Sequence, residues 1–144
     1  MRSWWLVILL VACAPQARDG VDLEGAGAPP ELGSTMTAAV AGDSVHFELH
    51  ITNVTGGPVS LEFTTAQRYD FEVADGEGVP VWRWSDDMMF AQALGTDVLA
   101  PGESRRYAAS WRPDGGGGVV VASGRLVARN YPIELRTMVE LPSR

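Results

Sequence analysis

Apolar and polar residues alternate with a period of two along most of the chain. The clearest run lies between residues 44 and 54, where Val45, Phe47, Leu49 and Ile51 share one face and polar residues occupy the other. This period is that of a β-strand with one buried face. No segment keeps a helical period over ten residues. The pattern therefore predicts an all-β protein.

Further runs of this kind follow one another, with turn signals about every 8–12 residues. They cover residues 34–41, 59–64, 69–74, 81–84, 105–111, 119–121, 125–129 and 131–139. The Gly- and Pro-rich stretches between them include residues 53–57, 75–78, 100–103 and 113–118. The pair Ser123-Gly124 interrupts one run, which predicts a β-bulge or bend.

Seven or eight short strands in residues 34–144 predict an immunoglobulin-like antiparallel β-sandwich, a fold of about 100 residues. The chain has a single Cys, Cys13, so no internal disulfide can hold the two sheets together. We therefore expect the aromatic residues of the stretch 67–94 to fill the core instead. The residues concerned are Tyr69, Phe71, Trp82, Trp84 and Phe90.

The pattern in residues 67–94 predicts a β-hairpin followed by a connecting segment. The strand 69–74 enters the turn Asp75–Gly78, whose residues tolerate positive φ, and the strand 81–84 returns with Trp82 and Trp84 two apart and therefore on one face. Ser85–Asp87 breaks the second strand, and the mostly apolar Met88–Leu94 follows. Met88, Met89 and Phe90 are expected to plug the core.

Five motifs along the domain resemble those of one protein family. They are Tyr69–Val73 (Y-D-F-x-V), Asp75–Gly78 (D-x-x-G), Val81–Ser85 (V-W-R-W-S), Phe90–Leu94 (F-x-Q-A-L) and Leu99–Ser104 (L-x-P-G-E-S). In these motifs the chain is similar to the intracellular proteinase inhibitor family, BsuPI type, over nearly all of the domain. The resemblance implies the sandwich fold and a protein-binding task, with a protease as one candidate partner. The chain departs from the family at Gly117–Val121, which lacks the usual Tyr, and it matches no reactive-site motif.

The N-terminus has the features of a bacterial lipoprotein leader. Arg2 precedes a nine-residue apolar run, Trp4–Ala12. Such a run suits a signal peptide, because a membrane span needs about 20 residues. Leu10-Val11-Ala12-Cys13 resembles a lipobox, so residues 1–12 are expected to be removed and Cys13 to be acylated. Two or three acyl chains give a stable anchor; a secretory signal with an incidental Cys is the alternative.

Residues 13–33 are rich in Gly, Pro and acidic residues and show no sustained apolar period. This composition predicts a flexible tether with a reach of about 25 Å. The predicted location is outside the cytoplasm, on the membrane as a lipoprotein, in the periplasm or at the cell surface.

Charge and composition exclude several classes of function. The net charge of −7 and the pI of about 4.7 argue against nucleic acid as a partner and against docking on anionic lipid. His46, Glu48 and His50 share one strand face, the pattern of a Zn²⁺ or Cu²⁺ site if a neighbouring strand supplied a further ligand. No third His exists, so metal binding ranks well behind a solvated sheet face.

No catalytic constellation stands out. Asp70 and Glu72 lie two apart on one strand, and we interpret them as turn and surface charges rather than as a glycosidase pair. Neither G-x-S-x-G nor a phosphate-binding loop occurs. We expect no enzymatic activity and no cofactor.

The loops Asp75–Gly78 and Ser85–Met89 are the candidate protein-contact surface, and the Gly-rich turn 113–118 is a third candidate. The residues concerned are Asp75, Gly76, Glu77, Gly78, Ser85, Asp86, Asp87 and Met88. Two functions stay open. A lipid-anchored binding module would offer a loop or an edge strand to a subtilisin-like serine protease. A structural or assembly module of the cell envelope would have no inhibitory activity.

Overall fold

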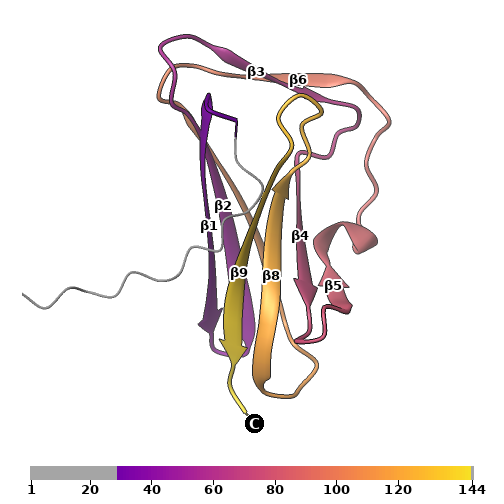
Figure 1. The fold of residues 1–144 in the computed structure, drawn as a ribbon. Coiled ribbons are helices and arrows are strands. Elements are labelled where there is room, and N and C mark those ends of the chain that lie inside the picture. The colour runs from indigo at the N-terminus through magenta and orange to yellow at the C-terminus, as the bar shows by residue number, and fades with distance from the viewer. Residues whose placement is uncertain (1–28, 144) are drawn as a thin grey trace, which may run out of the picture.

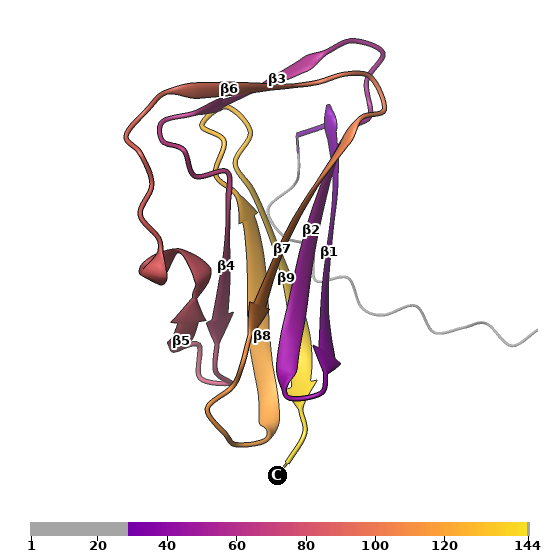
Figure 2. The ribbon, with the colours of Figure 1, turned by 180° about the vertical axis from the view of Figure 1, so that it is seen from behind.

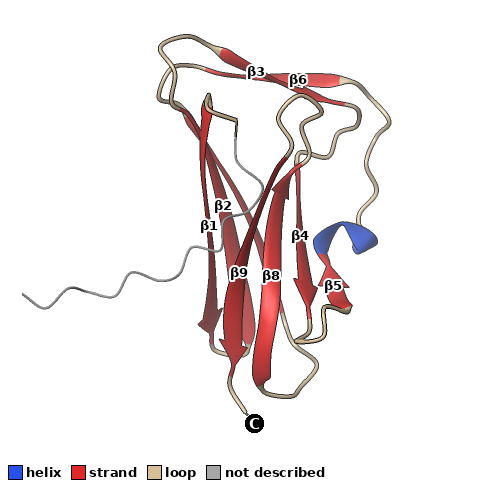
Figure 3. Ribbon diagram, in the orientation of Figure 1, coloured by secondary structure: helices blue, strands red, loops and turns tan. Residues whose placement is uncertain are grey.

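A computed structural model describes residues 29–143 of the chain. Within this range the chain forms nine strands and one short 3₁₀ helix, η1 (Figures 1 and 3). The strands are β1 Leu32–Ala41, β2 Ser44–Asn53, β3 Val59–Phe63, β4 Tyr69–Ala74, β5 Pro80–Arg83, β6 Gly95–Leu99, β7 Ser104–Trp111, β8 Gly118–Leu126 and β9 Ile133–Leu141. Helix η1 spans Trp84–Asp87. None of the helical structure in residues 29–143 has the length and apolar character of a membrane span.

The strands form two facing sheets and a small third one. The first large sheet has the order β1-β2-β7, the second has the order β5-β4-β8-β9, and β3 pairs with β6. Every strand pair is antiparallel. Strands β1 and β9 pack against each other on one side of the sandwich, and the β3–β6 ribbon crosses one end of it (Figures 1 and 2). The predicted antiparallel, immunoglobulin-like sandwich is confirmed.

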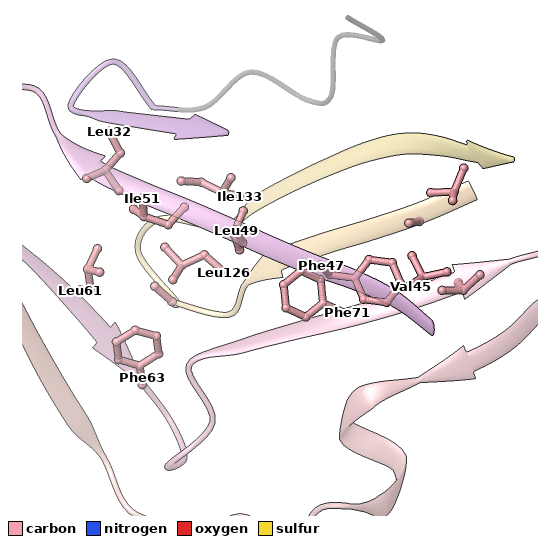
Figure 4. Close-up of a cluster of buried hydrophobic side chains, with 14 of the residues drawn as sticks. Leu32, Val45, Phe47, Leu49, Ile51, Leu61, Phe63, Phe71, Leu126 and Ile133 are labelled. Carbon is pink, nitrogen blue, oxygen red and sulfur yellow. The ribbon is translucent and has the colours of Figure 1, made fainter. Parts of the chain in front are cut away.

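The residues that the alternation predicts to be buried do form the core. Val45, Phe47, Leu49 and Ile51 of β2 are at most 1% exposed. They meet the inner faces of β4, β8 and β9, and the β3–β6 ribbon closes one end of the core with further apolar side chains (Figure 4). These are Val59, Leu61, Phe63 and Leu99.

The domain begins two residues earlier than the alternation predicts. Leu32 is 3% exposed and opens β1. Its N–H donates to the carbonyl of Pro29 at 3.0 Å, and the N–H of Val54 donates to Glu31 at 3.1 Å. The predicted signal peptide, Cys13 and the tether up to residue 28 lie outside the described residues.

The predicted bulge at Ser123-Gly124 is wrong. Strand β8 pairs with β9 in one uninterrupted register through these two residues. Gly124 is instead a position of close packing: a Cβ there would lie 3.0 Å from the Phe71 ring and 3.1 Å from Sδ of Met36, so these side chains would have to shift. The irregularity of this sheet lies instead between Val73 and Ala74 of β4.

Strand β6 is the one strand that the alternation misses. Its inward-facing residues include Asp97, whose carboxylate accepts a hydrogen bond from Nε of Arg68 at 2.8 Å. A polar residue at an inward position breaks the apolar period of two, so the pattern does not reveal the strand.

The turn after β2 is held together by the Asn53 side chain, which is fully buried. Its amide Nδ2 donates to the carbonyls of Gly57 at 2.7 Å and Leu99 at 2.9 Å, and its Oδ1 accepts from the N–H of Thr55 at 2.9 Å. Asn53 thereby ties the β2–β3 turn to β6, as a buried polar group must be hydrogen-bonded.

Candidate protein-contact site

Aromatic side chains close the side of the sandwich where β7 faces β4. The Tyr69 ring stacks between Trp84, with 4.3 Å between ring centroids, and Tyr107 of β7, at 4.9 Å. Phe90 continues this column at 5.8 Å from Trp84. Of the aromatic residues predicted to fill the core, only Phe71 is fully buried, whereas Tyr69, Trp82 and Trp84 are partly buried and pack against the core, and Phe90 is partly buried.

Trp82 and Trp84 do not share one strand face, contrary to the sequence prediction. Strand β5 ends at Arg83, and Trp84 is the first residue of η1. Trp82 lies in a separate stack between Phe47, at 5.7 Å, and Trp111, at 6.2 Å.

Asp70 is buried rather than a surface charge, with an exposed fraction of 4%. Its carboxylate accepts hydrogen bonds from the Ser85 hydroxyl at 2.8 Å and from the Ser85 N–H at 3.2 Å. Nη2 of Arg125 lies 3.4 Å away on the other side. A buried carboxylate needs such partners, so Asp70 fixes the start of η1 against β4.

Glu72 binds a different partner from Asp70. Its Oε2 pairs with the guanidinium of Arg83, and this hydrogen bond raises the pKa of Arg83 above its ordinary value. Each carboxylate of β4 thus has its own partner on the β5–η1 stretch.

The segment Met88–Leu94, here called the η1–β6 segment, projects away from the sandwich. Met89 is fully exposed, and Leu94 and Met88 are 86% and 45% exposed. The prediction that Met88 and Met89 plug the core is therefore wrong. Only Phe90 packs inward.

Contacts on both sides of Met89 hold the η1–β6 segment in place. The N–H of Met88 donates to the carbonyl of Ser85 at 3.1 Å, and the N–H of Ala66 donates to the carbonyl of Ala91 at 2.9 Å. Between them, Phe90 rests on Trp84. The segment is thus an exposed apolar loop fastened at its base.

The turn Asp75–Gly78 is closed by its own hydrogen bonds. Oδ1 of Asp75 accepts from the N–H groups of Glu77 at 3.0 Å and Val79 at 2.8 Å, while the N–H of Gly78 donates to the Asp75 carbonyl at 3.0 Å. Gly78 has φ +84°, which favours glycine. These backbone N–H groups are not free to bind a partner.

The predicted contact residues therefore lie in different environments. Gly76, Glu77 and Gly78 are exposed on the self-bonded turn, and Asp86, Asp87 and Met88 are exposed at the start of the projecting segment. Ser85 is a half-buried anchor for Asp70. Met89, the last residue of the predicted contact loop Ser85–Met89, is fully exposed, and Leu94, which was not predicted as a contact residue, is exposed as well.

The His-bearing face of β2 is occupied by ordinary polar contacts. Nε2 of His50 lies 3.2 Å from Glu48, and Nη1 of Arg106 donates to the same carboxylate at 2.8 Å. These partners, His50 first, lower the pKa of Glu48. Nδ1 of His46 lies 2.8 Å from the Ser110 hydroxyl. Residues 29–143 contain no group of three or more His, Cys, Asp or Glu side chains placed to hold a metal ion.

The profile of the family described as "BsuPI: Intracellular proteinase inhibitor" matches residues 32–131. The chain belongs to this family of proteinase inhibitors. The match covers the domain from the first residue of β1 through the β8–β9 turn. No curated protein matches significantly.

Several solved structures are similar in fold. A β-glucosidase, EmGH1, from Erythrobacter marinus is 13% identical with a TM-score of 0.45, over 77% of this chain and 15% of that one. The putative ApaA protein from Bordetella pertussis is 18% identical with a TM-score of 0.43, over 78% and 93%. The sporulation control protein Spo0M from Bacillus subtilis is 11% identical with a TM-score of 0.45, over 83% and 50%. These likenesses concern the fold alone.

Removing the charge of Asp70 should loosen η1. We expect Asp70→Asn to lower the free energy of unfolding by about 1–3 kcal/mol, because the hydrogen bonds from Ser85 and Arg125 lose a charged acceptor. Urea unfolding measures the stability, and hydrogen exchange of peptides covering residues 84–94 measures the local effect. Glu134→Gln is the matched control, since Glu134 lies on β9 and pairs with Arg136 of the same strand. Equal acceleration of exchange in both variants would contradict the anchoring role.

Alkaline pH should destabilise the aromatic columns. Burial raises the pKa of the Tyr69 and Tyr107 phenols above the ordinary value, with Asp97 adding to the effect at Tyr107. Their contribution to stability is complete below the unfolded pKa of about 10 and is lost as pH rises through the folded pKa. Urea midpoints at pH 9–11 measure this loss, and the chain has no Lys to titrate in that window. The variant Tyr69→Phe/Tyr107→Phe should show a smaller decline; an unchanged decline would contradict the assignment.

Proposed function

We propose that this chain is a lipid-anchored, non-catalytic binding module that inhibits a subtilisin-like serine protease outside the cytoplasm through its η1–β6 segment. The observation that carries this proposal is the placement of Met89. Its side chain is fully exposed, while the backbone on either side is fastened to the sandwich. Membership of the proteinase inhibitor family supports a protease as the partner.

The fastening favours tight binding. A loop that is already ordered loses little conformational entropy when it enters a cleft, so more of the contact energy appears as affinity. Interfaces between proteases and inhibitors change shape little on binding. The Phe90–Trp84 contact and the Ala66–Ala91 hydrogen bond supply this order.

The chemistry of the segment favours a protease with an apolar specificity pocket. Residues 88–94 contain Met, Phe, Ala, Gln and Leu and no basic residue. Asp86 and Asp87, just before the segment, are also unsuited to the acidic pocket of a trypsin-like enzyme. Met89 would occupy the apolar pocket, with Met88 and Leu94 in contact with its surroundings.

Replacing Met89 should weaken inhibition strongly. The full chain, purified in mild detergent, is titrated against subtilisin and chymotrypsin, with trypsin as the comparison enzyme. Burying a Met side chain contributes about 1.5–3 kcal/mol, so Met89→Ala should raise the inhibition constant by about 10- to 100-fold. Met138→Ala on β9, 60% exposed and on another element, is the matched control and should change nothing.

Two results would contradict the proposal. Equal weakening by Met138→Ala would show that the η1–β6 segment is not the contact. If the full chain inhibited neither enzyme at micromolar concentration, the inhibitor assignment to this protease class would fail and an assembly role in the envelope would become the better hypothesis.

The anchor is tested separately from inhibition. If the leader is processed as its sequence predicts, mass spectrometry of the mature N-terminal peptide should find Cys13 as the first residue, carrying acyl chains. Cys13→Ala should move the protein from the membrane fraction to the soluble fraction. An unmodified Cys13 in the mature protein would exclude the lipoprotein form.

A further inference from the structure

We propose that Met89 is a redox-sensitive modification site, at which peroxide-class oxidants form methionine sulfoxide and thereby switch off binding of the η1–β6 segment. This inference rests on the proposed function, because it concerns regulation of the same contact. Its physical basis is the unequal exposure of the methionine side chains.

The four methionines of residues 29–143 fall into three environments. Met36 packs against the buried core. Met138 is 60% exposed on the outer face of β9. Met88 and Met89 stand side by side on the projecting segment, 45% and 100% exposed. Since oxidation follows access to the sulfur, Met89 should react first and Met36 last.

The reaction is a two-electron oxygen transfer from the peroxide. The sulfur lone pair attacks one peroxide oxygen, an S–O bond forms and the O–O bond breaks. The sulfur is oxidised to the sulfoxide, and the hydroperoxide is reduced to water or to an alcohol. Methionine sulfoxide reductases reverse the change, with one enzyme for each sulfoxide epimer.

Oxidation at Met89 should alter binding without altering the fold. Because the Met89 side chain is fully exposed, the folded chain has no packing at this side chain to lose. The supports of the segment are the Phe90 ring and backbone hydrogen bonds, which contain no oxidisable sulfur. In an apolar protease pocket, however, the sulfoxide oxygen would be buried without a hydrogen-bond partner, which is costly.

The experiment compares the full chain before and after peroxide. Peroxide is destroyed with catalase before protease is added, so that the protease itself is not oxidised. Peptide mass mapping measures sulfoxide at each Met, and near-UV circular dichroism checks the fold. We expect Met89 to oxidise fastest, the fold to persist, and the inhibition constant for subtilisin to rise by about 10- to 100-fold. Treatment with both reductase types should restore the starting value.

Two variants localise the effect. In Met89→Leu the inhibition constant, whatever its starting value, should change little on peroxide treatment, because the reactive sulfur at this position is gone. Met138→Leu is the matched control and should remain as sensitive as the natural chain. Persistence of sensitivity in Met89→Leu would overturn the assignment to Met89.

The outcomes separate this inference from the proposed function. The untreated chain tests the proposed function, and absence of inhibition at that stage overturns both proposals. Inhibition that survives confirmed sulfoxide formation at Met89 overturns only the switch. Loss of the circular dichroism signal together with inhibition would also overturn it, because damage to the fold would then explain the loss.

Discussion

The geometry of η1 and of the candidate contact segment that follows it depends on the buried carboxylate of Asp70. A buried charge is costly unless it is paired and hydrogen-bonded. Ser85 supplies two of the donors, and it reaches Asp70 only because the chain leaves β5 at Arg83 and turns into η1. The projecting segment begins directly after this turn. The position of Met89 therefore follows from the pairing of Asp70.

The motif V-W-R-W-S at Val81–Ser85 gains a physical explanation from these contacts. Arg83 pairs with Glu72, and Ser85 binds Asp70, so alternate residues of β4 hold alternate residues of the β5–η1 stretch. Trp84 lies between them and stacks on Tyr69. The polar contacts and the aromatic stacking thus hold the same turn from two sides. Loss of either kind of contact should therefore weaken the other.

The sequence allowed the core of the sandwich to be predicted, but not its exceptions. Strand β2 was predictable because its buried face is wholly apolar, so the local pattern carries the information. Strand β6 was missed because Asp97 lies inward and is neutralised by Arg68, twenty-nine residues away in the chain. Gly124 was misread because the Phe71 ring of β4, which packs closely against it, is also remote in the sequence.

The same reasoning applies to the candidate site. The motifs located the stretch that contains it, and Asp86, Asp87 and Met88 are exposed as the break in the pattern suggests. Met89 was assigned to the core, as apolar residues are by default, and also to the contact loop Ser85–Met89, and only the second assignment agrees with its full exposure. Its exposure results from the Ser85–Asp70 anchor on one side and the Ala66–Ala91 hydrogen bond on the other. Both contacts join residues that only the fold brings together.

The sandwich also restricts how a partner can bind. Strands β5 and β7 are edges of their sheets, and an exposed edge is a template for an added strand. Strand β5 has only four residues and begins with Pro80, which has no N–H to donate. On β7, the Tyr69 hydroxyl donates to the carbonyl of Ala108 at 3.3 Å.

Strand β5 is therefore a poor site for strand addition, and on β7 the Ala108 carbonyl is already hydrogen-bonded. Of the two modes that the sequence left open, an edge strand and a loop, the loop is physically favoured. Tyr69 contributes to this preference in two ways, because its hydroxyl binds the Ala108 carbonyl of β7 while its ring supports Trp84 and, through it, Phe90.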